Sequence, residues 1–236
     1  DLDPRLPEAH NNLGLALKKQ GDLEGAVTAY TKAIDIDPQY AEASGNLGMA
    51  LIAQGKFEQA GKNLQKAVDL VPNCAEFQNN LGVFFNRQGL FEEAIAASEK
   101  AIAMSPDYLE AYNNLGTALM ELGRFDDANT AFEKAIAIDA ERAEPHHNQA
   151  LVLLLTGRFE QGWKEYEWRW RHSGFSTPLR PFSQQWWDGS ADGVGKLLIW
   201  GEQGIGDEVQ FSGLIRHIIS RGINVVVECD RRLAPL

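Results

Sequence analysis

The residues best suited to recognition chemistry in this chain are five asparagines that recur every 34 residues. Each side-chain amide offers N–H donors and a carbonyl acceptor, so it can pair with both the C=O and the N–H of a peptide backbone, whatever its sequence. The amides could instead bond neighbouring helices to one another and only fix the repeat, and both interpretations stay open. The five members of this asparagine row are Asn12, Asn46, Asn80, Asn114 and Asn148.

A second candidate site is the glycine-containing turn that begins at Gly201 and leads into an expected helix over 207–221. Glu228 imitates the ribose-binding acid of a dinucleotide site, but the glycines are not in the order G-x-G-x-x-G. Asp207 at the helix start would also repel a pyrophosphate. A simpler interpretation makes Asp207 the N-cap of this helix, with Gln210 completing a capping box.

The asparagine row belongs to a 34-residue pattern that repeats four times over 7–142 and decays afterwards. Each copy holds two stretches with apolar residues at helical spacing, such as 9–20 and 23–36. A glycine between them fits the left-handed residue that ends the first helix, and a proline such as Pro38 stops the second. A fixed period of this length predicts a solenoid with a concave binding surface. The glycines are Gly21, Gly55, Gly89, Gly123 and Gly157.

The pattern resembles the tetratricopeptide repeat (TPR), a helix–turn–helix unit, over roughly the first 170 residues. The resemblance implies that the asparagine row faces the concave groove. It is similar to the asparagine ladder of the O-linked N-acetylglucosamine transferase TPR superhelix, which holds substrate polypeptides. First helices about 10 Å apart would offer one asparagine to about every third residue of an extended peptide. The matching Leu-Gly pairs are Leu13-Gly14, Leu47-Gly48, Leu81-Gly82 and Leu115-Gly116.

Two rows beside the asparagines change from repeat to repeat and mix apolar with polar side chains. This mixture predicts a groove for an extended, fairly apolar protein segment rather than a charged clamp. The first row is Leu15, Met49, Val83, Thr117 and Leu151, and the second is Lys18, Ile52, Asn86, Met120 and Leu154.

Both ends of the array differ from its interior. Residues 1–4 match 35–38, which predicts the tail of a preceding repeat. In the fifth repeat, Arg169 replaces the small residue of a helix contact, so we expect stacking to stop there. The expected organisation is a TPR array over 1–171, a Trp/Pro/Gly-rich linker over 172–195 and an α/β segment over 196–236. The array comprises the end of one repeat, four full repeats at 7–40, 41–74, 75–108 and 109–142, and a degenerate closing repeat at 143–171.

Composition narrows the choice of partners. Residues 1–162 contain 13 Lys and Arg against 24 Asp and Glu, and the remainder contains nine of each, so the net charge of −11 belongs to the array. An acidic solenoid argues against nucleic acid and anionic membranes. No apolar run reaches the length of a membrane span. Two distant cysteines and the histidine spacing predict neither a disulfide nor a metal site, which suits a cytoplasmic protein.

After residue 195 the pattern becomes strand, helix and strand, expected at 196–200, 207–221 and 223–227, as in a βαβ unit. Residues 197–211, with the turn Gly204-Ile-Gly-Asp207, resemble the start of a GT-B glycosyltransferase, similar to the heptosyltransferase-like domains fused to bacterial TPR arrays. The resemblance implies Asp207 as general base and a nucleotide-sugar donor for the parent enzyme. The acceptor-binding residues that it implies are Gln203, Gly204, Gly206 and Glu208.

The sequence therefore predicts a mainly α protein, a right-handed TPR α-solenoid followed by an incomplete Rossmann-like α/β unit. We expect the groove to hold a polypeptide or partner protein for a glycosyltransferase whose catalytic domain only begins here. Because the chain ends at Leu236, it should be inactive alone and bind no cofactor. The alternative is an interaction scaffold without catalysis. Exposed apolar strands leave homo-oligomer formation open.

Overall fold

A computed structural model of the protein describes residues 6–172, 181, 183–184, 187, 190, 194–201 and 205–229. Within the helix that begins at Ile205, side chains are described from residue 212 onward. The chain divides into two compact units, an N-terminal region, Asp1–His172, and a C-terminal region, Ser173–Leu236.

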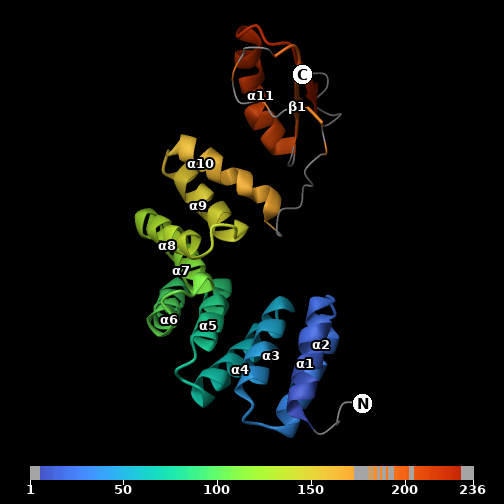
Figure 1. Ribbon diagram of the computed structural model, residues 1–236, viewed down its shortest axis with the longest axis vertical. Coiled ribbons are helices and arrows are strands. Elements are labelled where there is room, and N and C mark those ends of the chain that lie inside the picture. Colours follow the sequence, from blue (N-terminus) through green and yellow to red (C-terminus); the bar gives the residue numbers. More distant parts are fainter. Residues whose placement is uncertain are drawn as a thin grey trace. The chain divides into compact units, whose positions relative to one another are not determined.

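The N-terminal region is a succession of paired helices in which each helix packs on its neighbours in sequence (Figure 1). The described residues of the chain are mainly helical, as the sequence predicts. The first helices of the pairs are α1 (Pro7–Lys19), α3 (Ala41–Ala53), α5 (Ala75–Gln88), α7 (Leu109–Glu121) and α9 (Ala143–Leu155). The second helices are α2 (Leu23–Ile36), α4 (Phe57–Leu70), α6 (Phe91–Met104), α8 (Phe125–Ile138) and α10 (Phe159–Tyr166), and η1 (Glu167–Arg171) extends α10.

The glycine between paired helices takes the predicted left-handed conformation in every repeat. Gly89, for example, ends α5 with φ 71° and ψ 17°, a conformation that a residue with a Cβ adopts only with strain. The other four mid-repeat glycines have φ between 72° and 83°. The turn therefore depends on backbone conformation rather than on side-chain packing.

Small residues bring paired helices close enough to bury an aromatic ring or a leucine between them. A Cβ added to Gly116 on α7 would lie 2.5 Å from the ring of Phe132 on α8, and a Cβ added to Gly48 on α3 would lie 2.5 Å from Leu64 on α4. Phe132 and Leu64 are almost fully buried. Close packing of this kind tolerates little added volume.

The C-terminal region contains strands β1 (Leu197–Trp200) and β2 (Val225–Glu228) and helix α11 (Ile205–Ser220) between them. The strands are parallel, with Leu197 opposite Val225 and Trp200 opposite Glu228. The predicted strand–helix–strand order is therefore present (Figure 1). One pair of strands among the described residues does not make a Rossmann-like domain, and that part of the fold stays a prediction.

One local expectation is wrong. α11 begins at Ile205, two residues before Asp207, so Asp207 is the third residue of the helix and not its N-cap. A glycine at position 206 does not delay the start of the helix. Asp207 still lies in the first turn, where the helix dipole favours a negative charge.

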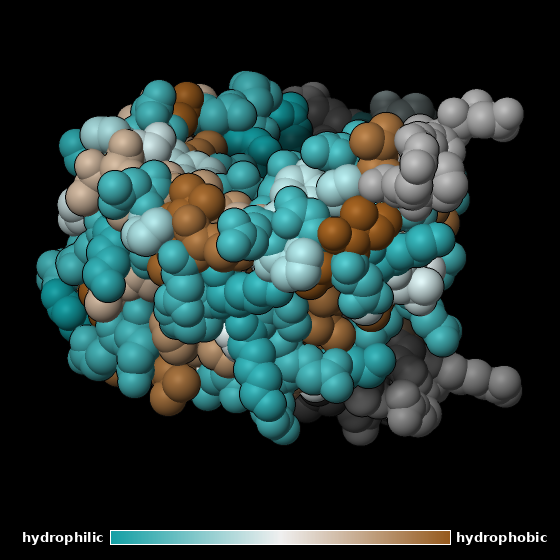
Figure 2. Space-filling model, turned by 90° about the horizontal axis from the view of Figure 1, so that it is seen from below, coloured by the Kyte–Doolittle hydropathy of each residue, from teal (hydrophilic) through white to brown (hydrophobic). Residues whose placement is uncertain are grey.

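Hydrophilic side chains cover most of the face that Figure 2 shows, and hydrophobic residues appear there as small separate patches. This distribution agrees with the excess of acidic over basic residues in the sequence. A charged surface keeps a protein soluble without specifying a partner.

Candidate binding groove

The first helices carry the asparagine row, and the structure divides its five members into two groups. The Nδ2 of Asn46 donates to Asn11 Oδ1 at 3.0 Å, that of Asn114 to Asn79 Oδ1 at 2.8 Å, and that of Asn148 to Asn113 Oδ1 at 3.0 Å. These bonds join α3 to α1, α7 to α5 and α9 to α7. In the described part of the chain, the side chains of Asn12 and Asn80 make no hydrogen bond.

The interpretation that the amides bond neighbouring helices therefore holds for three of the five, and the peptide-binding interpretation stays a prediction. Three amides use one N–H to bond a neighbouring first helix, and each keeps a second N–H and its carbonyl oxygen. These three residues, Asn46, Asn114 and Asn148, are half-buried. Asn80 is buried, with 8% of its surface exposed, and Asn12 is exposed.

Sequence reasoning missed the acceptors of these bonds, although a signal was available. Each acceptor immediately precedes a member of the asparagine row, in the doublets 11–12, 79–80 and 113–114. We call this column the acceptor position. It is occupied in successive repeats by Asn11, Gly45, Asn79, Asn113 and His147.

A hollow of about 450 Å³ joins the predicted groove rows between α5 and α7. Val83 and Asn86 on α5 and Asn114 and Thr117 on α7 line it. Asn86 Nδ2 donates to the backbone carbonyl of Asn114 at 3.0 Å, while the buried Oδ1 of Asn86 has no partner in the described residues. The hollow thus has an apolar side, and the Asn114 side chain that lines it keeps one N–H and its oxygen unused, a combination that suits a polypeptide segment.

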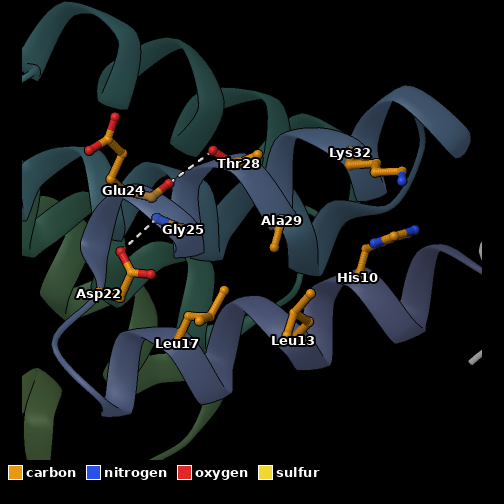
Figure 3. A pocket seen from close by; sticks show the side chains of 9 residues that line it. All are labelled: His10, Leu13, Leu17, Asp22, Glu24, Gly25, Thr28, Ala29 and Lys32. Atoms are coloured by element: carbon orange, nitrogen blue, oxygen red, sulfur yellow. Dashed lines mark hydrogen bonds between the residues drawn. The ribbon is translucent and has the colours of Figure 1, made fainter.

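A larger hollow, of about 530 Å³, lies between α1 and α2 and is not part of the groove. Figure 3 shows Leu13 and Leu17 on α1 and Ala29 on α2 bordering it. Leu13 is 44% exposed, whereas Leu47, at the same position of the next repeat, is 7% exposed. Leu47 lies on α3, which packs against α1 and α2. The hollow beside Leu13 therefore resembles the kind of surface on which one helix pair stacks against another.

The last repeat ends in a cluster of aromatic and charged side chains. Arg169 is 6% exposed, and its guanidinium lies 4.7 Å from the ring of Tyr166 and 4.4 Å from that of Trp170. His146 stacks on Trp168 with ring centroids 4.1 Å apart, and its Nδ1 lies 2.5 Å from the carboxylate of Glu165. Arginine thus replaces the expected small residue by stacking its planar group between rings.

Two family models match this part of the chain. Both describe the tetratricopeptide repeat, one over residues 17–81 and the other over 73–141. Residues 17–141 are tetratricopeptide repeats. The TPR assignment rests on sequence, and the paired helices with left-handed glycines agree with it. No curated protein matches the chain in sequence.

Solved TPR structures resemble the chain over about two thirds of its length. The crystal structure of MamA is 29% identical, with a TM-score of 0.56, covering 66% of this chain and 91% of MamA. PilF of Pseudomonas aeruginosa is 24% identical, with a TM-score of 0.63, covering 69% and 74%. A thermophilic TPR protein of Thermus thermophilus is 23% identical, with a TM-score of 0.62, covering 68% and 88%. The last two likenesses concern the fold alone.

The structure leaves the predicted catalytic site untested. Gln203 and Gly204 lie outside the described residues, and the side chains of Asp207 and Glu208 are not described. Gly206 lies in the first turn of α11. Among the residues that were described, none of the helices could cross a membrane, and no group of His, Cys, Asp or Glu is arranged to hold a metal ion.

Proposed function

We propose that the first helices of the TPR array form a groove that binds an extended segment of a partner protein. The observation that carries this proposal is the hollow between α5 and α7, in which Asn114 meets Val83, Asn86 and Thr117. Members of three rows that the sequence assigns to one groove are there brought together. TPR repeats bind proteins, and this surface is where the chain offers both apolar contact and unused amide groups.

The chemistry of the hollow suits a peptide backbone better than a compact small molecule. Its walls come from two successive repeats, so the surface continues along the array instead of closing into a pocket. Asn114 has one N–H and its carbonyl oxygen left after bonding Asn79. A peptide in extended conformation presents N–H and C=O groups at regular intervals and can satisfy such atoms in turn.

The charge of the array favours a neutral or basic segment. Every first helix has a glutamate in its first turn. Among the described residues, two of these carboxylates form an ion pair with Arg142, which lies 3.4 Å from Glu110 and 3.6 Å from Glu144. Phosphate-rich partners would be repelled. The five glutamates are Glu8, Glu42, Glu76, Glu110 and Glu144.

Two threonines allow a matched test of the groove. Thr117 lines the hollow and Thr130 lies exposed on α8, and each hydroxyl donates to the carbonyl four residues earlier at 2.9 Å. The probe is an array of neutral and basic synthetic peptides of about 12 residues, the length that spans five first helices about 10 Å apart. Affinity for the tightest peptide is then measured by fluorescence anisotropy.

We expect Thr117→Arg to fill the hollow and weaken binding by about tenfold or more, equivalent to about 1.4 kcal/mol, while Thr130→Arg leaves it unchanged. Absence of any bound peptide, or an equal effect of both substitutions, would contradict the proposal.

A second proposal is that the region from 196 onward belongs to a glycosyltransferase. The parallel β1 and β2 with α11 between them support it, together with the resemblance of the 197–211 segment to the GT-B family. Asp207 would remove the proton of the acceptor hydroxyl, and a nucleotide sugar would be the donor. The test is transfer of label from nucleotide sugars by the longest native form of the protein, with Asp207→Asn as the comparison. Activity that is equal in both forms would eliminate Asp207 as the base, and absent activity favours the scaffold without catalysis.

A further inference from the structure

The amide bonds between first helices are interrupted at one junction, that between α3 and α5. The donor–acceptor pairs elsewhere are 35 residues apart. The residue 35 positions before Asn80 is Gly45, which has no side chain to accept a hydrogen bond. Among Asn46, Asn80, Asn114 and Asn148, Asn80 is therefore the one whose amide makes no hydrogen bond in the described part of the chain.

A compensating substitution accompanies this glycine. Phe77 stands where α3 and α7 have the buried alanines Ala43 and Ala111. A Cβ added to Gly45 would meet the Phe77 ring at 3.2 and 3.3 Å, and Phe77 is 7% exposed. The ring thus lies against α3 at the place where an asparagine side chain would leave the backbone. The α3–α5 junction thus has glycine and phenylalanine where the α1–α3 and α5–α7 junctions have asparagine and alanine. Apolar packing takes the place of the amide bond.

The exchange leaves an unusual amide on α5. Asn80 is 8% exposed and makes no hydrogen bond within the described residues, yet its polar atoms are not among those cut off from solvent. Because only a small part of the Asn80 amide faces solvent, water cannot satisfy all of its donor and acceptor atoms, which carries a penalty. A ligand that supplies a donor and an acceptor together would remove this penalty, and one peptide unit supplies both.

We propose that Asn80 is the amide that pairs with the backbone of the bound polypeptide, whereas Asn46, Asn114 and Asn148 chiefly hold successive repeats in register. This inference rests on the groove proposed above and specifies its ligand further. Met49 and Ile52 are the equivalents, one repeat earlier, of Val83 and Asn86, which line the hollow with Asn114. We therefore expect Met49 and Ile52 to lie beside Asn80. The peptide residue next to the Asn80 contact is therefore apolar, and the residue about three positions along the peptide is polar.

The first test needs no ligand. Asn114→Ala removes an inter-repeat bond and lowers the thermal unfolding midpoint by a few degrees, whereas Asn80→Ala removes no bond and leaves the midpoint unchanged or raises it. An equal loss in both variants overturns the division of roles.

The second test transfers the amide pair to the interrupted junction. Gly45→Asn combined with Phe77→Ala recreates the asparagine and alanine of the α1–α3 and α5–α7 junctions and gives Asn80 an internal partner. The probe is the tightest peptide of the array described above. We expect Asn80→Ala and the double variant each to weaken binding by about tenfold. Asn63→Ala is the control, because the Asn63 amide bonds only within its own helix α4.

The outcomes separate the two proposals. Unchanged affinity in Asn80→Ala, with binding still lost in Thr117→Arg, overturns the role of Asn80 and leaves the groove in place. Unchanged affinity in both variants overturns the groove itself and this inference with it. Weaker binding in Asn80→Ala, in the double variant and in Thr117→Arg, but not in Asn63→Ala, supports both.

Discussion

The junction between α3 and α5 and the junction between α5 and α7 occupy equivalent places in the array but are held together differently. At the first, Phe77 packs against Gly45. At the second, Asn114 bonds Asn79 across the helices. A repeat can thus keep its geometry with apolar or with polar contacts. Where the contact is apolar, the asparagine of the row makes no hydrogen bond to the preceding first helix.

The largest expected effect comes from breaking the apolar junction. Phe77→Ala removes a nearly buried ring and leaves a cavity beside Gly45, which costs about 3–5 kcal/mol of unfolding free energy. Urea unfolding followed by circular dichroism measures this loss. Phe159, at 60% exposure, provides the control, and Phe159→Ala should stay within about 0.5 kcal/mol of the unsubstituted protein. Similar losses in the two variants would show that Phe77 does not hold the junction.

A smaller effect comes from breaking a polar junction. Asn148→Ala removes the bond to Asn113 and should cost about 1 kcal/mol. Asn12 occupies the same position but has no partner among the described residues, so Asn12→Ala should change stability by only a few tenths of a kcal/mol. The same urea experiment compares them. A larger loss in Asn12→Ala would mean that the row contributes through something other than these bonds.

Tyrosines accompany two of the polar junctions and give them a titratable marker. The pKa of Tyr108 is raised to about 12, mainly by burial of the hydroxyl and further by the nearby Glu110, Glu76 and Cys74. A hydrogen bond with the Asn79 side chain acts in the opposite direction. The folded protein therefore keeps this proton between pH 10 and 12 while the unfolded chain loses it, so stability falls as pH rises through that window. Spectroscopic titration should show a late tyrosine transition near pH 12 that disappears in Tyr108→Phe. A single transition near pH 10 for every tyrosine would refute this assignment.

The smallest effect concerns the last repeat, where His147 occupies the acceptor position. The pKa of His147 is lowered below its usual 6.5, mainly by burial and further by the charges of His172 and Arg169. Below pH 6.5 the unfolded chain binds a proton that folded His147 resists, so this residue makes stability fall with falling pH. Thermal unfolding between pH 7.5 and 5 should show a slightly shallower decline in His147→Asn than in the unsubstituted protein. A steeper decline would contradict the direction.

Much of the array could be predicted from the sequence because its cause is periodic. The glycines at 21, 55, 89, 123 and 157 recur, and each takes the left-handed conformation. The exchange of Gly45 and Phe77 could not be found in this way. Those two residues break the period at different places, and their connection is a contact in space. The sequence also places the start of α11 two residues late, because the expected turn includes Gly206, whereas this residue lies within α11.

The recurrence of the asparagine row could be read from the sequence, but its division by hydrogen bonds could not. The sequence presents five equivalent asparagines, and only the bonds to Asn11, Asn79 and Asn113 distinguish them. The doublets were visible, yet their meaning depends on the distance between first helices, which a period does not supply. The predicted acceptor-binding and catalytic residues around Asp207 stay predictions.

The most direct test of the groove and of its selective asparagine is an NMR titration that follows the side-chain amides of asparagine as the tightest peptide is added. We expect the Asn80 amide signals to shift most and to exchange more slowly with solvent, those of Asn114 to shift less, and those of Asn63 to stay in place. A peptide that binds at full occupancy without moving Asn80 would contradict this expectation.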